Sequence, residues 1–109
     1  MSYGSKYARR KAWWGYVKNF IRKYKFLKDM DRKELTETEM REIDAVKAAV
    51  EATRQMKDGE LRVRLVEIIF WRRTHTLEGA AMILHISERT AQRWHTEFIR
   101  TVAREYGLD

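Results

Sequence analysis

Apolar residues recur at intervals of three or four in the first third of the chain. The apolar positions there are Trp13, Val17, Phe20, Tyr24 and Leu27. Basic residues occupy the opposite positions, at Lys11, Lys18, Arg22 and Lys25. This spacing predicts an amphipathic helix with one basic face. Its aromatic face either packs on the rest of the domain, which we favour, or docks on a membrane or a partner protein.

A second helix is expected to begin after Thr36, because Thr36-Glu37-Thr38-Glu39 has the form of a capping box. Its apolar stripe comprises Met40, Ile43, Val46, Val50 and Met56. The run Lys57-Asp58-Gly59 predicts its end, with Gly59 in the left-handed conformation that closes helices. The following segment, 61–73, is rich in residues that favour strands. A single strand would have no pairing partner in this chain, so we expect a buried helix there.

The last third of the chain predicts two helices joined by a short turn. Thr76 can cap a short helix over 77–84, and Ser87 can cap a longer one over 88–106. The turn contains His85, a residue type that tolerates positive φ better than most. This is the pattern of a helix-turn-helix, which we place at 76–106. The residues expected to pack between its two helices are Ala81, Leu84, Ile86, Ala91 and Trp94.

The outer face of the predicted 88–106 helix is rich in arginine. It carries Arg89, Arg93, Thr96, Arg100 and Arg104, with Gln92 beside them. Arginine pairs well with guanine and glutamine with adenine in the DNA major groove. We therefore expect base contacts from Arg89, Gln92 and Arg93. We expect phosphate contacts from Ser87, Thr90, Thr96 and Arg100. The alternative is that these arginines only solvate an exposed face.

The composition of the chain favours an all-α fold. Its 109 residues include no proline, no cysteine and only five glycines. The usual turn residues of β folds and the ligands of thiolate metal sites are therefore scarce or missing. We expect a small helical domain at 35–109, preceded by a basic amphipathic arm and helix at 1–34. The chain shows no signal sequence and no apolar run long enough to span a membrane, which predicts a cytoplasmic protein.

The formal net charge of +7 is distributed unevenly. Residues 1–33 carry a formal charge of +9, residues 34–60 carry −4, and residues 71–104 carry +3. Positive stretches favour polyanionic partners, because neutralising phosphates releases condensed counterions. This distribution is compatible with nucleic-acid binding by the two ends of the chain.

No constellation of catalytic residues is apparent in the sequence. Gly59 and Gly79 do not form a phosphate-binding loop, and Ser87 is better explained as a helix cap than as a nucleophile. The three histidines are His75, His85 and His95, and they are not spaced to share a helix face. We therefore expect no enzymatic activity, no metal site and no cofactor.

The segment His85-Ile86-Ser87-Glu88-Arg89-Thr90-Ala91-Gln92-Arg93, followed by an amphipathic helix to Leu108, resembles the RinA/ArpU-type phage transcriptional activators. The C-terminal part of that family is similar to the helix-turn-helix of sigma-factor region four. The resemblance covers roughly residues 59–108. It implies sequence-specific binding to double-stranded DNA upstream of phage late genes, inside the host cytoplasm.

We therefore expect a DNA-binding transcriptional regulator, an activator of phage late genes, whose recognition helix spans 87–106. Activation would also require a contact with host RNA polymerase, which the acidic 34–60 helix or the basic arm could supply. The alternative is a small DNA-packaging protein, similar to a terminase small subunit, that recognises viral DNA as a homo-oligomer. A further rival is a membrane- or protein-binding module that uses the 13–27 helix.

Overall fold

The computed structural model describes residues 11–108, and their regular structure is entirely helical. The five α-helices of this part of the chain are α2 (Trp14–Leu27), α3 (Glu37–Arg54), α4 (Gly59–Val66), α5 (Leu77–Leu84) and α6 (Glu88–Tyr106). A short 3₁₀ turn, η1 (Arg32–Glu34), precedes α3, and a π-helical turn, η2 (Glu67–Arg72), continues α4. The expected all-α fold is confirmed. Residues 1–10, at the start of the expected basic arm, lie outside the described residues.

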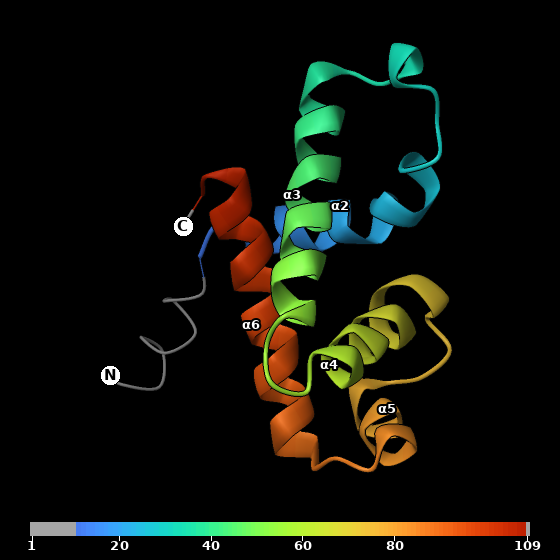
Figure 1. Cartoon of the computed structure of the whole chain (residues 1–109), viewed down its shortest axis with the longest axis vertical. Helices are drawn as coiled ribbons and strands as arrows, with labels where there is room; N and C mark the ends of the chain where they lie inside the picture. Colours follow the sequence, from blue (N-terminus) through green and yellow to red (C-terminus); the bar gives the residue numbers. More distant parts are fainter. Residues whose placement is uncertain (1–10, 109) are drawn as a thin grey trace.

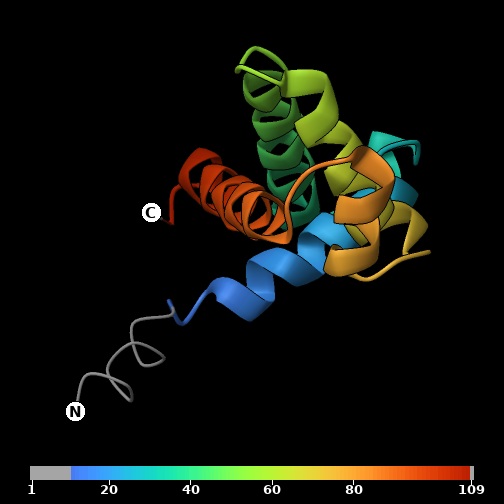
Figure 2. The ribbon, with the colours of Figure 1, turned by 90° about the horizontal axis from the view of Figure 1, so that it is seen from below.

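The helices form one bundle in which α3 and α6 lie side by side (Figure 1). The helix α2 crosses both of them, and α4 and α5 gather beside the N-terminal half of α6. Figure 2 shows the same bundle from below, where α2 lies across one side of it. None of the helices within residues 11–108 has the length and apolar character needed to cross a membrane.

Two clusters of buried side chains hold the bundle together. The first, here called the main core, comprises Val17, Phe20, Ile21, Ala45, Val46, Ala49, Val66, Phe70, Phe98, Ile99, Val102 and Ala103. The second, here called the helix-turn-helix core, comprises Leu65, Ile68, Ala80, Ala81, Leu84, Ala91 and Trp94. Three residues of α2 are in the main core, and Trp13 and Tyr24 pack against it. The favoured interpretation, in which the aromatic face of α2 packs on the domain, is confirmed.

Side-chain caps start three of the helices where the sequence predicts them. At α3, the Thr36 hydroxyl accepts a hydrogen bond from the Glu39 N–H (3.0 Å), and the Glu39 carboxylate accepts one from the Thr36 N–H (2.9 Å). This is the expected capping box. Thr76 and Ser87 likewise cap α5 and α6. These caps satisfy N–H groups that have no partner within the first turn of a helix.

The end of α3 differs from the prediction. The helix ends at Arg54, so Met56 lies beyond it and is exposed rather than part of its apolar stripe. The left-handed residue is Asp58 (φ 59°), not Gly59. Gly59 begins α4, and a Cβ atom there would lie 2.1 Å from the Arg54 carbonyl oxygen. Glycine is therefore required at this position for a close backbone approach and not for a positive φ.

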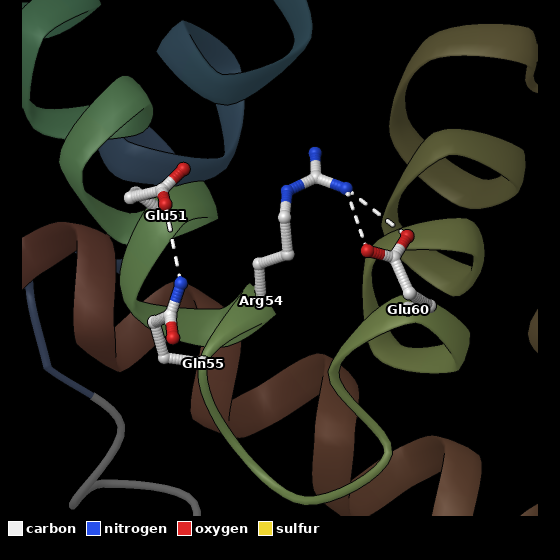
Figure 3. Close-up of polar contacts among 4 residues, drawn as sticks. All are labelled: Glu51, Arg54, Gln55 and Glu60. Atoms are coloured by element: carbon white, nitrogen blue, oxygen red, sulfur yellow. Dashed lines mark hydrogen bonds and ion pairs between the residues drawn. The ribbon is translucent and has the colours of Figure 1, made fainter.

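A polar contact also links α3 and α4, the two helices that residues 55–58 connect. Figure 3 shows Arg54, at the end of α3, extending to Glu60 in the first turn of α4. Its Nη1 atom donates to both carboxylate oxygens of Glu60, at 3.1 and 3.2 Å. Because both side chains are largely exposed, this pair contributes little to stability.

The 61–73 segment is helical, as expected, but its second half is not an α-helix. In η2 the hydrogen bonds span five residues instead of four. The Arg73 N–H, for example, donates to the Ile68 carbonyl (2.9 Å). Arg73 then ends the turn in the left-handed conformation (φ 54°). The turn places Trp71 against α2, where its indole N–H donates to the Ile21 carbonyl (2.8 Å). This long-range contact ties α2 to η2.

Candidate nucleic-acid interface

The turn between α5 and α6 consists of three residues, His85, Ile86 and Ser87. His85 adopts the left-handed conformation (φ 57°), so the positive φ expected there is confirmed. The Ile86 N–H donates to the Ala81 carbonyl (3.0 Å), and the His85 N–H donates to the Met82 carbonyl (3.2 Å). This pair of bonds is a Schellman closure, which ends α5 sharply and directs the chain into α6.

The helix-turn-helix core brings together the residues expected to pack between α5 and α6. Ala81 is only 2% exposed, and Leu84, Ala91 and Trp94 are buried with it. Ile86 is partly buried against the same cluster. Leu65 and Ile68 complete this core from α4 and η2, so α4 is the third helix of the unit. In Figure 1, α5 is seen almost end-on beside α6, which runs down the page.

The N-terminus of α6 is held by a local pair of hydroxyl groups. The Ser87 hydroxyl accepts a hydrogen bond from the Thr90 N–H (3.0 Å) and donates to the Thr90 hydroxyl oxygen (2.9 Å). The hydrogen of Ser87 is therefore used inside the protein. The hydroxyl hydrogen of Thr90 remains available to an external acceptor.

The predicted base-contacting residues all lie on the exposed side of the first turns of α6. Arg89, Gln92 and Arg93 are exposed, as is Arg100 further along the helix. Among residues 11–108, no ion pair engages any of these arginines. Gln92 makes one long, exposed hydrogen bond to Glu88 (3.4 Å). The cationic groups of this face are therefore free to meet an anionic partner.

A residue that the sequence analysis did not single out holds α6 in place. Arg62 of α4 lies over the Trp94 ring, 4.9 Å from its centroid, and donates to the Glu97 carboxylate at 2.8 Å. It also donates to the Lys57 carbonyl (3.2 Å). The cation–π contact and the ion pair together fix the middle of α6 against α4. The ion pair also offsets the negative charge of Glu97, which lies on α6 near Arg93.

Thr96, like Thr90, is less accessible than the other predicted contacts, which are exposed. It is half-buried and lines a groove of about 280 Å³, together with Trp14, Lys18, Leu77, Gln92 and His95. The helix α2 thus borders the polar face of α6 at Gln92 and Thr96, a neighbour that periodicity within each helix cannot reveal. His95 turns inward and stacks parallel to Phe70, with ring centroids 5.3 Å apart.

The length of α6 separates its arginines into two groups. Its 19 residues extend about 28 Å, whereas the major groove of DNA is about 12 Å wide. Arg89 and Arg93 lie in the first two turns, while Arg100 lies about 16 Å beyond Arg89 along the helix axis. Arg89 and Arg93 therefore form one cationic group at the start of α6, and Arg100 and Arg104 form a second group near its end.

Comparison of this chain with protein-family models, with curated proteins and with solved structures found no match.

Proposed function

We propose that this chain is a sequence-specific double-stranded DNA-binding protein that regulates transcription, with α6 as its recognition helix. The observation that supports this most is the display of Arg89, Gln92 and Arg93. These residues are exposed on the first turns of a helix held by a helix-turn-helix core. The resemblance of residues 85–93 to RinA/ArpU-type activators agrees with this function and suggests the control of phage late genes.

The proposed base contacts follow from the chemistry of three side chains. Arg89 and Arg93 lie four residues apart on one exposed face, and each can donate two hydrogen bonds to a guanine. Gln92 can donate to and accept from an adenine once it exchanges its long bond to Glu88. Neighbouring bases in one major groove would then be recognised by neighbouring turns of one helix.

The proposed phosphate contacts divide into direct and indirect ones. Arg100 is exposed further along α6, from where it would contact the DNA backbone, and Thr90 retains a free hydroxyl hydrogen. Thr96 lines the groove on the protein surface that Lys18 also lines. The Ser87 hydroxyl is engaged with Thr90, so a phosphate contact from Ser87 would require its hydrogen to turn outward. Ser87 contributes by fixing the N-terminus of α6, whose free N–H groups favour phosphate.

Activation of transcription would require a second surface for RNA polymerase. The helix α3 offers exposed acidic residues for this purpose, at Glu37, Asp44 and Glu51. Their charge is opposite to that of the recognition face, so the two surfaces would not compete for DNA.

Selection of bound duplexes from a random DNA pool tests the proposed function. We expect the full chain to enrich a single motif that contains guanine at two positions. Failure to enrich any motif would contradict sequence-specific regulation. Light scattering on the same sample addresses the DNA-packaging alternative, which predicts a ring of many subunits and weakly selective binding.

A further inference from the structure

A second groove lies on a different part of the molecule, where α2, α3, α4 and η2 meet. Its volume is about 360 Å³, and none of its lining residues belongs to α5 or α6. It is therefore separate from the candidate DNA interface. Its volume falls within the range of about 300–1,000 Å³ that is usual for small-molecule sites.

Four cationic side chains line this groove: Lys25, Lys28, Arg54 and Arg72. Within residues 11–108, neither lysine nor Arg72 takes part in an ion pair. Arg54 engages Glu60 through Nη1 alone, and Figure 3 shows the other guanidinium nitrogens without a contact among the residues drawn. Cationic donors that converge on one hollow favour an anion with several acceptor oxygens, such as a phosphate.

Two aromatic rings form a further part of the groove lining. Tyr24 and Trp71 lie with their ring centroids 5.3 Å apart, and the indole of Trp71 is anchored by its bond to the Ile21 carbonyl. The two rings are tilted by 37° to each other, and the anchored indole of Trp71 provides a surface on which a flat ring can stack.

The π-helical turn places three different kinds of side chain on the same groove. Glu67, Trp71 and Arg72 all come from η2 and all line it. π-helical turns are rare and occur frequently at functional sites. Glu67 is the one acidic residue among the lining residues, and its carboxylate can accept hydrogen bonds from hydroxyl or amino groups.

We propose that this groove binds a small ligand that joins a phosphate to a flat ring, of the class of nucleoside monophosphates. The lysines and arginines bind the phosphate, and the ring lies against Tyr24 and Trp71. Glu67 accepts a hydrogen bond from a hydroxyl or amino group of the ligand. This inference does not depend on the proposed DNA binding, because the two surfaces share no residue.

Calorimetric titration of the full chain with adenosine monophosphate tests this proposal. We expect saturable binding that Lys25→Gln weakens about tenfold, the loss typical of one charge-assisted contact. Lys23→Gln is the matched control, since Lys23 is exposed on the same helix and does not line the groove. Inorganic phosphate should bind more weakly than the nucleotide, because it lacks the ring.

Three outcomes would overturn the proposal. They are no saturable binding, an equal loss in Lys23→Gln and Lys25→Gln, and equal affinity for phosphate and nucleotide. Titration of the same variants with duplex DNA separates this proposal from the proposed function. We expect Lys25→Gln to keep the DNA affinity of the parent chain. If it weakens DNA binding while the nucleotide does not bind, the groove belongs to the DNA interface instead.

Discussion

The two cores of this molecule differ in the size of the side chains that fill them. The main core contains three phenylalanines, and half-buried tryptophans and tyrosines pack around it. Three of its twelve residues are alanines, whereas the helix-turn-helix core has three alanines among seven residues and one aromatic residue, Trp94. The rings of Phe20, Phe70 and Phe98 come from α2, η2 and α6 and fill the main core. The alanines of the helix-turn-helix core allow α5 to lie close to α6. The main core thus anchors the bundle, and the helix-turn-helix core holds the half of α6 that carries Arg89 and Arg93.

The helix α6 belongs to both cores. Ala91 and Trp94, in its N-terminal half, are part of the helix-turn-helix core, while Phe98, Ile99 and Val102 are part of the main core. The half that is anchored among large side chains is not the half that displays Arg89 and Arg93. Substitutions in the two halves should therefore have different consequences for stability and for DNA binding.

The largest effect is expected from Phe98→Ala in the main core. Removing this buried ring should cost about 3–5 kcal/mol of unfolding free energy, because it leaves a cavity among closely packed side chains. Urea denaturation followed by circular dichroism measures the loss. Phe26→Ala is the matched control, since Phe26 is 76% exposed and its removal should change stability by no more than about 0.5 kcal/mol. Equal effects of the two substitutions would contradict the assigned core.

A smaller effect is expected from Ala81→Leu in the helix-turn-helix core. The larger side chain should overpack the contact between α5 and α6 and cost about 1–3 kcal/mol. DNA binding should weaken as well, because α6 would be displaced. Ala52→Leu, at an exposed position of α3, makes the same chemical change without burial. If both variants melt at the same temperature, the alanines do not set the distance between the helices.

A hydrogen bond between Tyr16 and Glu42 should make the free energy of unfolding depend on pH. Glu42 is only 4% exposed and accepts a hydrogen bond from the Tyr16 hydroxyl, which lies 3.2 Å from the Tyr106 hydroxyl. Burial, followed by the bond to Glu42, raises the pKa of Tyr16 above its ordinary value of 10. The unfolded chain then loses this proton at a lower pH than the folded chain. The stability that the Tyr16 hydroxyl contributes should therefore be intact below pH 10 and be lost as the pH rises above that value.

Tyr16→Phe tests this dependence. The variant should lose about 1–2 kcal/mol at neutral pH, because Glu42 loses its hydrogen-bond donor. Above pH 10 the stability of the parent chain should fall toward that of the variant, which has no hydroxyl to ionise at this position. Burial and Asp29 also raise the pKa of Tyr24, so some dependence on pH should persist in the variant. Urea midpoints measured from about pH 8 to about pH 11 check this, and parallel curves for the two proteins would count against the Tyr16–Glu42 bond.

Local features of the sequence were sufficient to predict much of this fold. The caps at Thr36, Thr76 and Ser87 depend on residues three positions away, so the helix starts that they define were predicted correctly. Helical periodicity and a short turn were also sufficient to predict which residues pack between α5 and α6. The arginine face of α6 follows from the same periodicity, and the structure leaves it exposed.

Features that depend on distant contacts were not predictable in the same way. The π-helical turn brings Trp71 to the carbonyl of Ile21, fifty residues away. The interactions of Arg62 with Trp94 and Glu97 join two helices, and neither partner is apparent from the spacing within α4. Asp58, and not Gly59, adopts the left-handed conformation, and Gly59 instead lies close to the backbone of α3.

The central claim is that the N-terminal half of α6 reads DNA bases, and one comparison of two arginines tests it most directly. Arg93 and Arg104 are both exposed on the same side of α6, but the proposed function assigns a base contact to Arg93 alone. Fluorescence anisotropy should compare Arg93→Ala, Arg104→Ala and the parent chain on the selected duplex and on a scrambled one. We expect Arg93→Ala to lose about 1–3 kcal/mol of binding free energy on the selected duplex only, and Arg104→Ala to affect both duplexes equally and weakly. If Arg93→Ala binds both duplexes as the parent chain does, the arginine face is solvated surface and the account is wrong.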